Sequence, residues 1–103
     1  MAKRLEAGQA EHAGRIKVVI AAEAIGNDPS GVPDDVVVDL MLPFVPTVGM
    51  HMSPTLQSDF YEVERVYWTA NNPDELQVYV KPVEPMRPVE EMLRQGWRRM
   101  LPS

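Results

Sequence analysis

Few side chains in this 103-residue sequence could do chemistry, and they are not spaced as in known catalytic sites. Its two histidines, His12 and His51, fall in no metal-ligand motif such as H-E-x-x-H. The absence of cysteine excludes thiolate nucleophiles and cysteine-bound zinc. There is no G-x-S-x-G, G-x-G-x-x-G or P-loop motif either. We therefore expect no catalytic residue, no cofactor site and no metal site.

Carboxylates are the most numerous groups that could act as acids or bases. Glu62 and Glu64 alternate with apolar residues, as on the solvated face of a strand, so we interpret them as surface positions. Asp39 is different, because it interrupts a run of apolar residues and a partly buried carboxylate needs a hydrogen-bond donor. Arg65 is the only base between residues 18 and 80 and is the candidate donor.

The charge is unevenly distributed along the chain. The net charge is −5, but residues 18–80 carry ten acidic residues against one arginine, whereas residues 1–17 and 81–103 are mildly basic. An acidic body repels phosphate backbones and attracts positively charged surfaces. We therefore expect a basic protein partner and consider nucleic acid unlikely as a ligand.

Aromatic residues are concentrated in the second half of the chain. They could form a platform on which nucleic-acid bases stack, but such platforms are accompanied by lysine and arginine, which this region lacks. We interpret them as residues of the hydrophobic core. The set comprises Phe60, Tyr61, Tyr67, Trp68 and Tyr79.

Methionine is frequent, and three methionines lie close together in the sequence. Met41, Met50 and Met52 either fill gaps in the core or form an adaptable binding surface. Trp97 belongs to an apolar stripe near the C-terminus. It packs either against the protein's own β domain or against another chain, and the sequence leaves both alternatives open.

Alternating apolar residues predict a series of short strands separated by turns. Pro46 and Gly49 predict a sharp corner near Thr47 to Gly49. The predicted strands cover Arg15 to Glu23, Val36 to Leu42, Met50 to Met52, Phe60 to Thr69, and Leu76 to Val80.

The fourth of these strands changes phase partway along. Tyr61 and Val63 share one face, whereas Val66 and Trp68 share the other, so a regular strand cannot bury all four. A β-bulge at residues 64–65 would reconcile them, because one extra residue switches the side-chain alternation.

This pattern of strands, turns and prolines divides the chain into three segments. Residues 1–14 are read as a flexible leader, residues 15–81 as the β domain, and residues 82–103 as a proline-rich linker with a C-terminal helix. The helical spacing runs from Val89 to Met100, with acids in the first turn and the pair Arg98–Arg99 in the last.

The runs LPFVPTVGM, FYEVERVYW and LQVYV together resemble the small SH3-like β-barrels found in uncharacterised bacterial and phage proteins. The resemblance covers Val36 to Val80 and carries no active-site signature. It implies a mainly β (α+β) fold, an antiparallel barrel or bent meander of four or five strands with one C-terminal helix. Residues 36–52 would supply its central strand and first corner.

The favoured function is that of a small, non-enzymatic interaction module with an acidic surface, associated with a phage or mobile element. We expect a cytoplasmic protein, because no apolar run is long enough to cross a membrane and no signal peptide is evident. A chain of this size gains stability from association, so a homodimer is expected. The predicted interaction residues are Asp39, Met50, Met52, Glu62, Glu64 and Trp97.

One alternative remains open at this point. A small-ligand-binding or enzymatic barrel would need a concave pocket with convergent polar groups. We place that pocket near Asp39, Tyr61 and Trp68.

Overall fold

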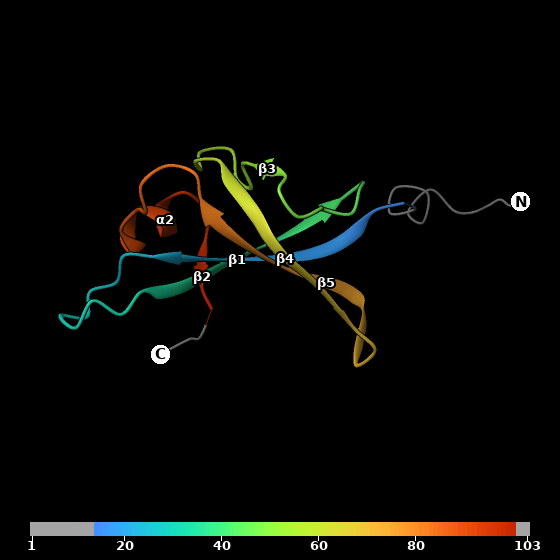
Figure 1. The fold of residues 1–103 in the computed structure, drawn as a ribbon, viewed down its shortest axis with the longest axis horizontal. Coiled ribbons are helices and arrows are strands. Elements are labelled where there is room, and N and C mark those ends of the chain that lie inside the picture. The colour runs from blue at the N-terminus through green and yellow to red at the C-terminus, as the bar shows by residue number, and fades with distance from the viewer. Residues whose placement is uncertain (1–13, 101–103) are drawn as a thin grey trace, which may run out of the picture.

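The computed structural model describes residues 14–100, which form a curled half-barrel sheet of six strands with one short helix (Figure 1). The mainly β fold with a helix near the C-terminus is therefore confirmed. Apart from Gly14, the predicted leader lies outside the described residues. The elements are β1 (Ile16–Ala24), β2 (Asp34–Leu42), β3 (His51–Met52), β4 (Tyr61–Thr69), β5 (Asn72–Pro82), α2 (Val89–Arg94) and β6 (Arg98–Arg99).

The strand order is β3-β4-β5-β1-β2-β6, so β1 lies in the middle of the sheet. The prediction that residues 36–52 supply the central strand is wrong, since β2 is next to the edge. The sheet is also not wholly antiparallel, because β1 pairs with β5 in parallel and with β2 in an antiparallel register. Figure 1 shows the β4–β5 hairpin crossing β1 and β2 diagonally, which gives the sheet its curl.

The inner face of the sheet carries the hydrophobic core. Val18 and Ile20 of β1 are completely buried there, and α2 contributes Met92, which is also completely buried. The Trp97 ring packs against Tyr61 with 5.4 Å between ring centroids. Because Trp97 is only 3% exposed, the C-terminal segment packs on its own sheet, which decides between the two alternatives left open above.

The C-terminal helix is shorter than predicted. It ends at Arg94, and Gly96 follows with a φ of +109°. The Trp97 N–H donates to Met92 O and the Gly96 N–H donates to Leu93 O, which is the Schellman arrangement for ending a helix. The spacing up to Met100 was misleading, because the glycine turns the chain and Arg98–Arg99 then form a strand.

The predicted β-bulge in β4 is confirmed. The pairing between β4 and β5 shifts register between Val63 and Arg65. Tyr61 and Val63 before the shift, and Val66 after it, all belong to the hydrophobic core or pack against it.

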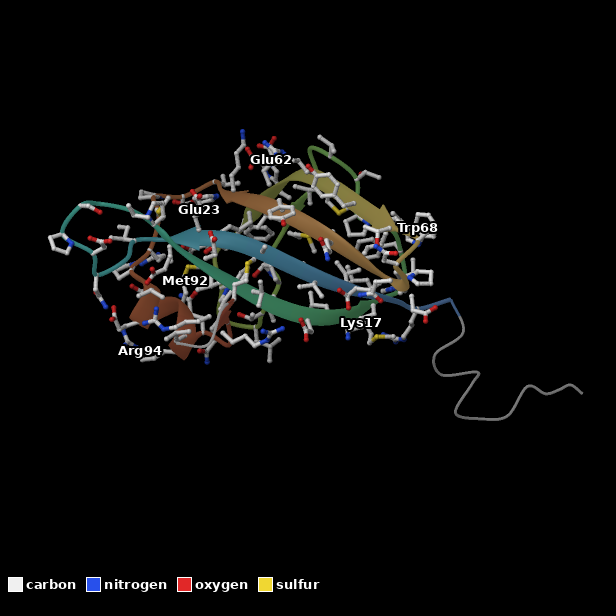
Figure 2. The ribbon with its side chains drawn as sticks, turned by 90° about the horizontal axis from the view of Figure 1, so that it is seen from below. Lys17, Glu23, Glu62, Trp68, Met92 and Arg94 are labelled. Atoms are coloured by element: carbon white, nitrogen blue, oxygen red, sulfur yellow. The ribbon has the colours of Figure 1, made fainter. Side chains whose placement is uncertain are left out.

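The interpretation of the aromatic residues as core is wrong for four of the five. Only Tyr61 is buried, and the others are between 39% and 59% exposed. Tyr67 and Tyr79 lie on the outer face of the sheet, because each is offset by one residue from a core position on its strand. Phe60 precedes β4, and Trp68 lies near its far end, beyond the cover that α2 provides (Figure 2).

The predicted corner after β2 is present. Gly49 has a φ of +92°, and the Met50 N–H donates to Thr47 O at 3.0 Å to close the turn. The Gly49 N–H donates to Val63 O at 2.9 Å and so ties the corner to β4.

The substitution Gly49→Val should destabilise the protein by about 1 kcal/mol or more, since a β-branched side chain is strained at positive φ. No atom lies within 4 Å of the added Cβ, so the loss measures backbone strain alone. The control His51→Ala removes an exposed side chain and should change stability by less than about 0.5 kcal/mol. Chemical denaturation measures both, and equal stability of wild type and Gly49→Val would contradict the corner.

A second prediction concerns Tyr61. Burial, followed by the charge of Asp59, raises the pKa of Tyr61 to about 12. The folded state thus favours the neutral phenol, and this stabilisation is present below about pH 10 and lost between pH 10 and 12. Two pKa units correspond to roughly 2 to 3 kcal/mol.

The variant Tyr61→Phe isolates this contribution. Within residues 14–100 the Tyr61 hydroxyl donates to the Met92 sulfur, at 3.8 Å, and to no carboxylate or carbonyl, so phenylalanine leaves no strong acceptor unpaired. Urea denaturation between pH 9 and 12 should show a shallower loss of stability for the variant. Superimposable pH curves for the two proteins would be the contrary result.

Candidate functional site

The outer face of the sheet has a floor of small apolar side chains. Val19 and Ala21 alternate with the core residues of β1, and Val37 lies directly opposite Ala21 on β2. Ala21 is 7% exposed and Val37 is 3% exposed, although both lie on the face away from the core. The middle of the sheet is therefore apolar on both sides.

Two walls rise beside this floor and make a groove of about 230 Å³, which we call the outer groove. On one side Tyr79 of β5 stands beside Ala21, and its ring meets Tyr67 edge-on with 5.7 Å between centroids. On the other side stand Arg98 and Met100. The shape suits a chain segment lying along β1.

The groove continues into a second hollow of about 390 Å³ at the C-terminal end of β1. This end is lined by three carboxylates, those of Glu23, Asp35 and Glu64, and by two bases, Arg65 and Lys81. Because Ala21, Tyr79 and Met100 line both hollows, we treat the two as one groove with an acidic end.

Glu23 and Asp35 form a cross-strand pair of like charge, because they are directly opposite in the β1–β2 register. Such pairs are destabilising unless a cation lies between them. Among residues 14–100 no ion pair includes either side chain. The two carboxylates are therefore able to accept a cationic group from outside.

Arg65 does not serve as the donor to Asp39, so that prediction is wrong. Arg98 donates to both oxygens of Asp39, at 3.1 and 3.3 Å, after β6 returns to the sheet. Arg65 instead donates to the Tyr67 hydroxyl at 3.5 Å, and this hydrogen bond is the main cause that raises the pKa of Arg65. The 59-residue separation of Asp39 and Arg98 explains why the sequence did not reveal the pair.

Other C-terminal arginines also fold back onto the acidic body. Arg99 pairs with Asp34 at 3.0 Å, and Arg87 pairs with Asp59 at 2.8 Å. The acidic body and the basic C-terminal segment are thus partly neutralised by one another. At the end of the groove, three carboxylates against two bases leave one net negative charge.

The predicted interaction residues do not form one surface. Asp39, Glu62 and Glu64 belong to the strands that form the outer face, but Asp39 is on β2 and the two glutamates are on β4. Met50 and Met52 are partly buried against the core. Trp97 is buried, as described above.

The alternative pocket near Asp39, Tyr61 and Trp68 is not assembled. Asp39 points to the outer face, whereas Tyr61 is buried on the inner face. Trp68 lies near the opposite end of β4 from Tyr61, and its indole N–H donates to Pro73 O at 2.9 Å. None of the three side chains lines the outer groove or its acidic end.

The residues that sequence reasoning missed are those of the groove floor. One signal could have revealed them, because the predicted first strand is apolar at both phases, with Val18 and Ile20 on one face and Val19 and Ala21 on the other. A strand that is apolar on both faces is typical of the middle of a sheet. Glu23 and Asp35 lie opposite one another because of the β1–β2 register, and residue spacing in the sequence does not show that register.

Comparisons with protein-family models, with curated proteins and with solved structures found no match. Within residues 14–100 no group of three or more histidine or acidic side chains is arranged to hold a metal ion. The same residues include no helix with the length and apolar character needed to cross a membrane.

We expect the like-charge pair Glu23–Asp35 to lower the stability of the folded protein. Glu23→Gln should stabilise the protein by about 0.5 kcal/mol, because it removes the repulsion from Asp35. Raising the salt concentration should reduce this gain, since salt screens exposed charges. Urea denaturation at low and high salt measures the effect, and a destabilised Glu23→Gln variant would show that Glu23 makes a favourable contact instead.

Proposed function

We propose that the protein is a non-enzymatic interaction module that binds a basic segment of another protein in the outer groove. The observation that carries this proposal is the pair of facing carboxylates, Glu23 and Asp35, at the end of the outer groove. A like-charge pair reduces the stability of the free protein, and a bound cation would relieve that cost.

The chemistry of the groove favours lysine or arginine attached to an apolar segment. Long basic side chains lay their aliphatic stems on apolar surface while the charged end reaches a carboxylate. Val19, which is partly exposed, offers that apolar surface, and Tyr79 offers an aromatic face for a cation. A phosphate backbone would meet the carboxylates and be repelled, so a nucleic acid fits less well.

The wider setting rests on the sequence alone. Association with a phage or mobile element and a cytoplasmic location stay predictions. Salt-dependent binding is expected, because at least part of the attraction acts between solvent-exposed charges.

The test uses a fluorescent synthetic peptide of alternating lysine and valine as a probe, with fluorescence anisotropy as the measurement. The double variant Glu23→Gln/Asp35→Asn should bind this peptide several-fold more weakly, up to about tenfold, because two charge contacts are lost. Binding to the wild type should weaken as salt increases.

The matched control is Asp74→Asn/Glu84→Gln, which makes the same change in net charge at two exposed acids that do not line the groove. It should bind the peptide within about twofold of the wild type. An equal loss in both double variants would show that only overall charge matters, and the outer groove would then be the wrong site.

A further inference from the structure

Half of β2 has a free edge. β6 covers β2 only at Val36 and Val37, through their pairing with Arg99 and Arg98. Residues 38–42 pair with β1 on one side and with no strand of residues 14–100 on the other. A sheet edge of this kind is a template on which another strand can pair.

The direction of the backbone groups follows from alternation. The Met100 N–H donates to Asp35 O, so the backbone of Asp35 points toward the β6 side. Every second residue of a strand points its N–H and C=O to the same side, which places those of Asp39 and Met41 on the free edge. The Arg15 side chain reaches Met41 O at 3.5 Å, as expected for a carbonyl outside the ladder with β1.

The inner-face side chains beside this edge are incompletely covered. Val38, Leu40 and Leu42 pack against the core, yet all three are only partly buried. These three residues follow β2 toward the end of the sheet that lies away from α2. Figure 2 shows Met92 and Arg94 at one end of the molecule and Lys17 toward the other. Lys17 is opposite Met41 in the β1–β2 register, so this part of β2 lies toward the end away from α2. Apolar surface therefore continues up to the free edge.

We propose that this edge pairs with the same edge of a second copy, antiparallel and centred on Leu40, to give a two-fold symmetric dimer. In this register Asp39 of each copy exchanges both backbone hydrogen bonds with Met41 of the other. Leu40 meets Leu40, and Val38 meets Leu42, on the inner face. The half-covered apolar side chains of the two copies then cover one another.

Charge favours a second copy over a basic partner at this edge. Asp39 already pairs with Arg98 of its own chain, so the edge has no unmatched carboxylate for a cation. Across the proposed interface Asp39 is opposite Met41, which avoids like charges in directly facing positions. Copies with a net charge of −5 can therefore approach at a locally neutral surface.

The size of the contact sets its strength. Stable interfaces bury roughly 800 Å² per partner. A five-residue strand pair with three apolar side chains per copy is a smaller contact than this. We expect a reversible dimer that forms at micromolar to submillimolar protein concentration.

Analytical ultracentrifugation of the full chain tests the proposal with charge changes at Met41. Its side chain is 42% exposed, so both Met41→Glu and Met41→Lys should fold, which circular dichroism verifies. In Met41→Glu the new carboxylate faces Asp39 of the second copy at two symmetric positions, which should weaken the dimer about tenfold. In Met41→Lys the new ammonium faces the same carboxylate, which Arg98 already pairs, so this variant should weaken the dimer less than Met41→Glu does.

The control variants Val32→Glu and Val32→Lys make the same net charge changes in the exposed β1–β2 loop and should leave the dimer unchanged. A wild-type monomer up to millimolar concentration would overturn the proposal. If the dissociation constant of the dimer is unchanged in Met41→Glu, or changes equally in Val32→Glu, the contact between the copies lies elsewhere. Met41 does not line the outer groove, so the outcome of this experiment does not depend on whether the groove binds a peptide.

Discussion

Burial of β1 between β5 and β2 is the constraint on which the rest of the structure depends. Val18 and Ile20 are completely buried on its inner side, so the opposite phase of the same strand must face outward. A slip of one residue would exchange the two faces and place small side chains in the core. The register that builds the core therefore also builds the floor of the outer groove.

The C-terminal segment completes both faces of this sheet. On the inner side Met92 and Trp97 cover the core, and the turn at Gly96 then sends the chain to the edge of β2. On the outer side Arg98 forms one wall of the groove and satisfies Asp39. The segment that sequence patterns separate as a linker and helix is thus integral to the sheet.

The sequence predicted features that depend on local chemistry, and it failed where distant segments decide the outcome. The corner at Gly49 and the bulge before Arg65 follow from turn residues and from a change of alternation a few residues long. The partner of Asp39 and the facing of Glu23 with Asp35 require knowledge of which strands are neighbours. Local spacing does not contain that information, and the same reason explains why the central strand was assigned to residues 36–52.

In our proposal, β1 separates a closed core from a binding groove on the outer face of the sheet. Methyl NMR of the labelled protein, titrated with the lysine–valine peptide, tests it most directly, because neighbouring residues of β1 report on opposite faces. We expect progressive shifts for the methyl groups of Val19 and Ala21, with those of Val18 and Ile20 nearly unchanged. Shifts of equal size on both faces, or confined to Val18 and Ile20, would contradict it.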